Sequence, residues 1–99
     1  MLMMREVLNC RPGKVGALVK KFKELGALMQ EMRLEPFRLY TDVSGGRFWT
    51  LVLEREFESL EEMQGLEAKV MADARAQAIM TGYHDLVERG SREIYKVES

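Results

Sequence analysis

The stretch SGGRFWTLVLERE, residues 44–56, holds a glycine pair, the only tryptophan of the chain and an apolar run that ends in alternating charges. The β-branched and aromatic residues of this run predict a strand from about Arg47 to Phe57. Ser44–Gly46 is short and glycine tolerates positive φ, so it predicts a tight turn after a strand at 37–43. The middle of the chain therefore reads as an antiparallel β-hairpin.

On the N-terminal side of the hairpin the pattern predicts a strand followed by a helix. Residues 2–11, LMMREVLNCR, are apolar with mixed alternation and end before Pro12 and Gly13. From there the apolar period changes to steps of three and four residues, which is the spacing of one helix face. That face comprises Val15, Leu18, Phe22, Leu25, Met29 and Met32.

On the C-terminal side the order repeats, with a helix before a strand. SLEE at 59–62 is a capping-box pattern, in which the serine hydroxyl accepts from the fourth residue's amide and the glutamate bonds back. The inward positions of this helix are Leu60, Met63, Leu66, Val70 and Ala74, and Met80–Gly82 predicts its break. A short helical segment at 83–89 would end at Gly90, and alternating SREIYKV at 91–97 predicts the last strand.

The order βαββαβ is typical of the ferredoxin-like α+β fold. Right-handed crossovers place both helices on one face of a four-stranded antiparallel sheet. The 99 residues have the length of one domain and show no linker or repeat, so we expect a single domain spanning 1–99.

Composition narrows the range of functions. Net charge is −1, and the chain lacks the basic-Gly-aromatic run of RNA-recognition domains, which share this element order, so nucleic acid is not an expected partner. No apolar run approaches the roughly 20 residues of a membrane helix, and no signal peptide is recognisable at the start. The lone Cys10 excludes an internal disulfide and fits a reducing compartment, so the expected location is cytoplasmic.

The second face of the predicted sheet needs a cover. Both faces of the 47–57 strand begin apolar and end charged, whereas one layer of helices covers only one of them. We therefore expect two copies of the chain to pack their sheets together about a two-fold axis, forming a homodimer.

Three segments, REVLNCRPGK, EREFESLEEM and GSREIY, resemble the dimeric α+β barrel superfamily, and within it the NIPSNAP-like proteins. The resemblance spans nearly the whole chain. It implies a homodimer joined through the sheet faces, of uncharacterised function, that binds a small molecule or acts as an accessory protein. The alternative within the same superfamily is a cofactor-independent monooxygenase-type enzyme acting on an aromatic or electron-rich substrate, so whether the chain is an enzyme stays open.

Haem-degrading members of that superfamily use an asparagine on the first strand, a tryptophan near the end of the third and a histidine on the second helix. Asn9 matches in place, but Trp49 opens the third strand and His84 follows the second helix. The sequence therefore predicts neither haem nor another cofactor. One histidine also falls short of the three or four ligands of a metal site.

If a ligand binds, we expect its pocket between the helix layer and the sheet. The polar and aromatic candidates for its lining are Asn9, Arg11, Tyr40, Trp49, Arg55, Tyr83 and His84. For an enzyme, His84 is the candidate general base, and Asn9 or Arg11 would donate hydrogen bonds to a substrate anion. A one-residue slip of any strand would turn such a side chain to the opposite face.

Overall fold

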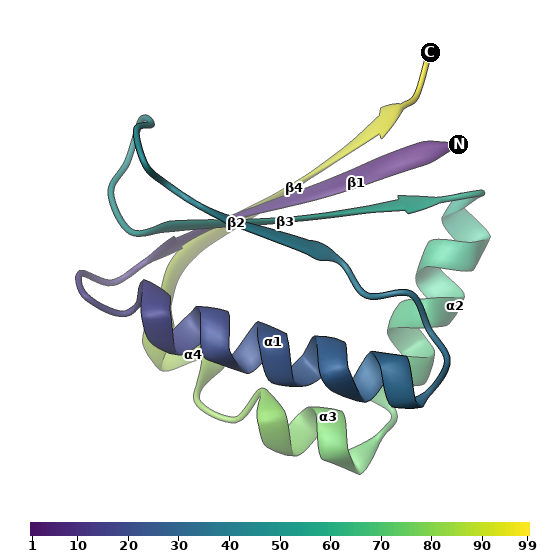
Figure 1. Ribbon diagram of the computed structural model, residues 1–99, viewed down its shortest axis with the longest axis horizontal. Helices are drawn as coiled ribbons and strands as arrows, with labels where there is room; N and C mark the ends of the chain where they lie inside the picture. The colour runs from purple at the N-terminus through teal and green to yellow at the C-terminus, as the bar shows by residue number, and fades with distance from the viewer.

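The computed structural model describes residues 1–99 as a four-stranded antiparallel sheet with every helix on one side (Figure 1). The elements are β1 (Leu2–Cys10), α1 (Val15–Glu31), β2 (Arg38–Thr41), β3 (Thr50–Phe57), α2 (Leu60–Met71), α3 (Ala74–Ile79), α4 (Tyr83–Leu86) and β4 (Val87–Lys96). The strands lie in the order β2-β3-β1-β4, each antiparallel to its neighbours. The ferredoxin-like α+β fold predicted from the sequence is confirmed.

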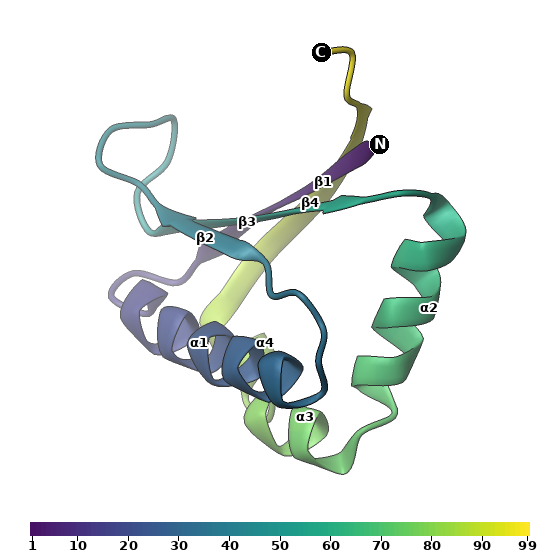
Figure 2. The same ribbon diagram turned by 45° about the vertical axis from the view of Figure 1, so that its right-hand side comes forward.

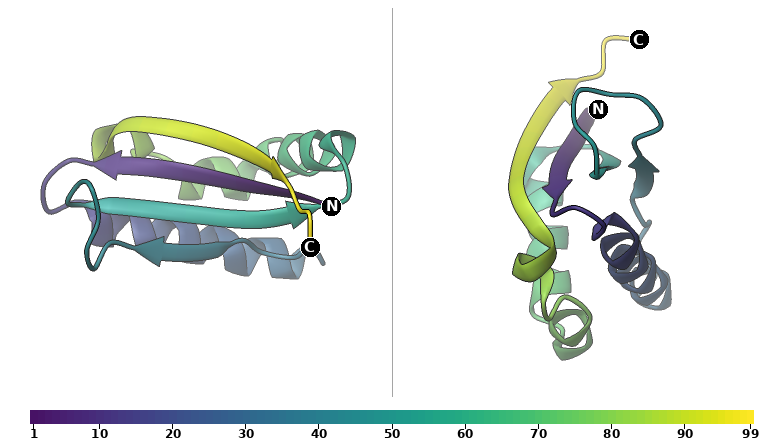
Figure 3. Two further views of the ribbon diagram at one scale, coloured as in Figure 1. Left: turned by 90° about the horizontal axis from the view of Figure 1, so that it is seen from above. Right: turned by 90° about the vertical axis from the view of Figure 1, so that its left-hand side faces the viewer.

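The helices are arranged so that α2 leaves the sheet instead of lying along it. Figure 2 shows α1 running beneath the strands, α2 leading away from the end of β3, and α3 packed under α1. Seen from above, the strands lie in front of all four helices, so the other face of the sheet carries no helix (Figure 3). None of these helices combines the length and apolar character that crossing a bilayer requires.

The core lies between α1 and the sheet. The apolar stripe predicted for residues 15–32 faces inward, and Leu18 and Met29 are essentially inaccessible. Residues at even positions of β1 pair with odd positions of β3, which brings Leu8 beside Leu51 on the helix side of the sheet. Burial of these side chains provides the main driving force for folding, at about 25 cal/mol per Å² of apolar surface.

The N-terminus of α2 is capped much as predicted. The Ser59 hydroxyl accepts from the Glu62 amide at 3.1 Å. The Glu62 carboxylate accepts from the amide of Glu58, one residue earlier than the capping box requires, at 2.6 Å. Both bonds satisfy amides that have no partner within the helix.

The predicted second helix breaks earlier than expected, between α2 and α3. The carboxylate of Asp73 accepts from the amide of Arg75 at 2.8 Å and so caps a new helix at this point. Hydrogen bonds from the Arg75 side chain and amide lower the pKa of Asp73 to about 2. The break changes the inward positions: Ala76 is fully buried, whereas Ala74 and Leu60, predicted to face inward, are exposed.

The C-terminus of α3 is tied to α1 by one lysine. The Lys21 ammonium donates to the carbonyl oxygens of Ile79 and Thr81, which lie where the helix dipole is negative. Gly82 then takes φ of +87° and turns the chain into α4. This connection carries the chain back to the sheet.

Replacing Gly82 with alanine is expected to lower the free energy of unfolding by about 1 kcal/mol, because a Cβ disfavours this left-handed conformation. Gly65→Ala is the matched control. Gly65 lies inside α2 with open space around it, and alanine there should raise stability by about 0.5–1 kcal/mol. Urea denaturation of both variants measures the difference, and equal stabilities would contradict the assigned backbone at Gly82.

The last strand begins four residues earlier than predicted. β4 starts at Val87, so the short helix covers only 83–86, and Gly90 does not end a helix as predicted. Gly90 lies within β4 opposite Leu8, whose Cδ2 is only 3.0 Å from where a Cβ would stand. A side chain at this position would press on Leu8, a contact between distant residues that the local sequence does not reveal.

The connection between β2 and β3 is wider than the predicted turn. It is an irregular loop over 42–49, and neither of its glycines has positive φ. Trp49 instead takes φ of 63° and lies outside β3. The carboxylate of Asp42 accepts from the Thr50 amide at 2.7 Å and closes the loop. The tryptophan thus precedes the strand, whereas the apolar run and the charged residues that follow it lie within β3.

Candidate functional site

A cavity of about 530 Å³ opens between the sheet and the helices that lead away from it. Twelve of the eighteen residues that line it are apolar. It exists because α2 diverges from β3 and α3 packs on α1, which leaves the helix side of β1 and β4 partly uncovered beside α2. Its position between the helix layer and the sheet is the one expected from the sequence.

An aromatic wall forms one side of the cavity. The ring of Phe22, on the inner face of α1, meets Phe37 and Tyr83 edge to face, with centroid distances of 5.5 and 6.4 Å. His84 in turn meets the ring of Tyr83 edge to face at 5.3 Å. Such pairs are worth about 0.5–1.5 kcal/mol beyond the surface they bury, so they fix the wall in place.

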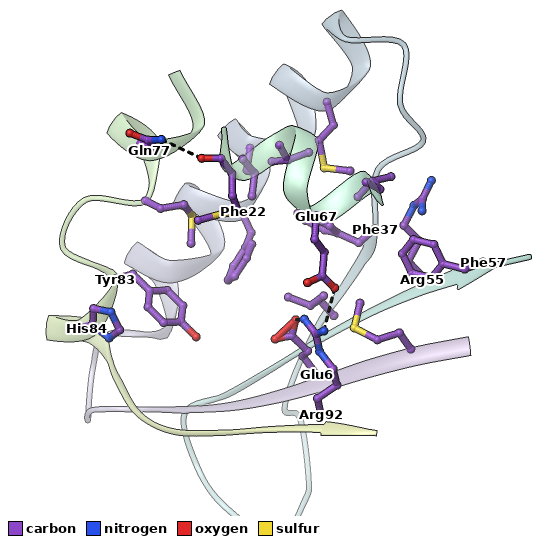
Figure 4. A pocket seen from close by; sticks show the side chains of 18 residues that line it. Glu6, Phe22, Phe37, Arg55, Phe57, Glu67, Gln77, Tyr83, His84 and Arg92 are labelled. Carbon is purple, nitrogen blue, oxygen red and sulfur yellow. Dashed lines mark hydrogen bonds and ion pairs between the residues drawn. The ribbon is translucent and has the colours of Figure 1, made fainter. Parts of the chain in front are cut away.

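The opposite end of the cavity is polar and is built by three elements. Glu6 of β1 and Arg92 of β4 are cross-strand partners, and Oε1 of Glu6 accepts from Nη2 of Arg92 at 2.9 Å. Glu67 reaches in from α2, and its Oε1 lies 2.8 Å from Nη1 of Arg92, an ion pair without the alignment of a hydrogen bond (Figure 4). We call Glu6, Arg92 and Glu67 the polar triad. Burial opposes the charge of Arg92, but the contacts with the two carboxylates raise its pKa overall.

The hydroxyl of Tyr83 points from α4 into the cavity toward Glu6 (Figure 4). Burial raises the pKa of Tyr83, and the negative charge of Glu6 raises it further. The phenol therefore stays protonated at neutral pH and acts as a hydrogen-bond donor. No side chain of the cavity wall accepts a hydrogen bond from this hydroxyl.

Arg55 lies at the rim of the cavity, on β3. Its guanidinium stands over the ring of Phe57 at 4.4 Å, and its Nε donates to the carbonyl of Glu35 at 2.8 Å. In Figure 4 the guanidinium is turned away from the polar triad. Its Nη1 atom is buried without a hydrogen-bond partner.

Of the seven residues predicted to line a pocket, the structure brings Arg55, Tyr83 and His84 together at the cavity. The remaining four lie elsewhere, which corrects their expected placement. Asn9 is at an odd position of β1 and points to the helix-free face of the sheet, where its Nδ2 donates to Oγ1 of Thr50 at 3.2 Å. Tyr40 is exposed on the same face.

Trp49 and Arg11 are the other two residues that lie outside the cavity. Trp49 belongs to the exposed 42–49 loop. Its positive φ breaks the alternation of side chains along a strand, so that alternation does not direct its side chain toward the cavity. Arg11 follows β1 in an exposed turn, and its amide donates to the carbonyl of Leu86 at 2.9 Å. Neither side chain contributes to the cavity wall.

The polar triad was not predicted from the sequence. Glu6 lies between Met4 and Leu8 on the same side of β1, and both of these residues are buried. An acidic residue within an apolar row is a signal that the sequence does contain. Such a position usually requires a partner. The partner, Arg92, is 86 residues away and depends on the register of β4, which the pattern did not provide.

The helix-free face of the sheet is mixed in character. Val7 and Val52 are paired at its centre, with Tyr40 beside them on the next strand. Arg5 and Glu54 cross the same face as an ion pair of 2.7 Å. We call this surface the open face. Cys10 is buried on the other side as a free thiol, and burial raises its pKa.

The architecture is shared with solved structures of low sequence identity, while the chain matches no protein-family model and no curated protein sequence. A protein from Agrobacterium tumefaciens described as a NIPSNAP family protein of unknown function superposes with a TM-score of 0.83 at 22% identity, covering 98% of this chain and 87% of that one. An uncharacterised NIPSNAP domain protein from Burkholderia xenovorans gives 0.81 at 18% identity, covering 100% and 96%.

A putative antibiotic biosynthesis monooxygenase from Nitrosomonas europaea has the same architecture, with a TM-score of 0.74 at 12% identity and full coverage of both chains. At identities this low, the superpositions show a shared fold and carry no information about activity. The chain has the fold of the NIPSNAP-like structures, as the resemblance implied.

Proposed function

We propose that the protein binds a small, mainly apolar molecule in the cavity between its helices and its sheet. The cavity itself carries this proposal, because about 530 Å³ of mostly apolar space lies within the range of small-molecule sites. The few polar groups gather at one end, which is how such sites orient a ligand. The free thiol of Cys10 favours a reducing compartment such as the cytoplasm as its location.

The proposed form of the protein is a homodimer joined through the open face. Val7 and Val52 form an apolar centre there, and charges of both signs surround it. A two-fold axis that passes between a positive and a negative group of this surface pairs each of them with its opposite on the other copy. A polar rim around an apolar centre is the usual anatomy of a protein interface.

Catalysis on the bound molecule is a second candidate, favoured by His84 at the cavity mouth against the ring of Tyr83. His84 has the residue type of a general base near neutral pH. Asn9 and Arg11, the donors expected for an enzyme, lie outside the cavity, so any substrate anion would need other donors. If the protein turns over a bound molecule in an oxygen-dependent reaction, loss of that turnover in His84→Ala with retained binding of the molecule would support an enzyme.

Binding is tested by filling the cavity. Leu66 lies on α2 and lines it, so Leu66→Trp should weaken binding of the neutral dye Nile red about tenfold or more by occupying the ligand's space. Leu60→Trp on the same helix is the matched control, because Leu60 is exposed and outside the cavity. Fluorescence titration of both variants, with far-UV circular dichroism to check folding, measures the effect.

Two results would refute the binding proposal. One is the absence of dye binding to the unmodified protein. The other is equal weakening by both tryptophan variants, since the dye would then be binding to an exposed surface.

A further inference from the structure

We propose that the cavity excludes anions and takes an apolar or aromatic body with one hydroxyl or amide group that contacts Tyr83 and the polar triad. This inference rests on the proposed function and specifies the chemical class of the ligand. It is argued from the charges and hydrogen-bonding groups at the polar end.

The charge of the polar triad opposes an anionic ligand. Arg92 is already engaged by two carboxylates, Glu6 at 2.9 Å and Glu67 at 2.8 Å. The three groups together carry one excess negative charge. A ligand carboxylate placed there would meet this charge while its attraction to Arg92 is already offset, so the site disfavours anions.

A hydrogen-bond donor and hydrogen-bond acceptors remain free at the polar end of the cavity. The Tyr83 hydroxyl points into the cavity and donates, since burial and Glu6 keep it protonated. Glu6 and Glu67 each contact Arg92 through Oε1, so the Oε2 atom of each carboxylate still accepts. A free donor beside free carboxylate acceptors matches a hydroxyl or an amide, which both accepts and donates.

The remaining cation of the cavity lies apart from the polar end. Arg55 is held at the rim by the Glu35 carbonyl and by the ring of Phe57, with its guanidinium turned away from the polar triad. Its charge therefore does not offset that of the polar triad.

The body of the ligand is set by the apolar wall. Phe22, Phe37 and Tyr83 all line the cavity, and aromatic rings suit an aromatic partner. The space is ample for a two-ring system with a short substituent.

The test uses three compounds with the same rings: naphthalene, naphthalenemethanol and naphthoate. Each competes with Nile red for the unmodified protein near neutral pH. We expect the alcohol to bind about tenfold or more tightly than naphthoate. Equal or tighter binding of naphthoate would overturn the inference while leaving the proposed function intact, whereas failure of all three compounds and of the dye would overturn the proposed function itself.

Two variants locate the polar contacts. Tyr83→Phe should weaken the alcohol about three- to tenfold and leave naphthalene unchanged, because it removes only the hydroxyl. Glu67→Gln should strengthen naphthoate about tenfold, because it removes the excess negative charge. Glu61→Gln, an exposed carboxylate of the same helix outside the cavity, should change neither compound. An unchanged alcohol affinity in Tyr83→Phe, or an unchanged naphthoate affinity in Glu67→Gln, would overturn the inference.

Discussion

Replacing Leu51 with alanine is expected to lower the free energy of unfolding by about 2–5 kcal/mol. Leu51 is 0% exposed and lies on β3 at the centre of the helix side of the sheet, opposite Leu8. The neighbouring side chains belong to strands fixed by hydrogen bonds on both sides, so they cannot collapse into the space left by the lost methyl groups. A domain of this size has about 5–15 kcal/mol of total stability, and the change is a large part of it.

Leu60→Ala is the matched control for this prediction, since Leu60 is 49% exposed at the start of α2. Its loss should cost less than about 1 kcal/mol. Thermal or urea denaturation of both proteins compares them. A small effect at Leu51 would mean that the core is not centred on β3.

The second large effect is expected from Val52→Lys on the assembly. Val52 is paired with Val7 at the centre of the open face, one residue away from Leu51 but on the other side of the sheet. In a two-fold dimer the substitution occurs twice and buries two unpaired ammonium groups. The dimer dissociation constant should rise about a hundredfold or more, while the fold is retained.

Sedimentation of the unmodified protein and of Val52→Lys measures this constant. Val52→Thr is the control, because it keeps the shape of valine without a charge and should remain dimeric. A protein that is monomeric before any substitution, or a lysine variant that dimerises equally well, would refute the proposed interface.

The parts of the fold that depend on local pattern were predictable from the sequence. The three-and-four spacing that starts at Val15 gave α1 and its inner face, and Ser59 marked the start of α2. The order of strands and helices then led to the ferredoxin-like sheet. These features depend on neighbouring residues in the chain, which periodicity and capping describe well.

The departures occur where contacts between distant residues decide the outcome. Gly90 looks like a helix stop until its packing against Leu8 is known. Trp49 looks like a strand residue, but its carbonyl accepts from the Cys10 amide at 2.8 Å and its φ is positive, so it ends the loop instead. Both positions are set by residues of β1 that lie far earlier in the chain.

The same limit applies to the candidate site. Arg55, Tyr83 and His84 were predictable as polar or aromatic residues near the helix layer. Glu6 and Arg92 meet only through the register of β1 and β4, and Glu67 joins them only because α2 diverges from the sheet. Neither the register nor the divergence leaves a signal in the local sequence.

The central place of β1 has a consequence for synthesis of the protein. Leu2 pairs with Phe57 on one side and with Lys96 on the other, so the first strand made is the last to be fully enclosed. Closing such a long loop is entropically costly, and chains dominated by distant pairings fold slowly. Until the ribosome has released most of the chain, the apolar side of α1 has no completed sheet to cover it, and this nascent stage is when the protein is most exposed to aggregation.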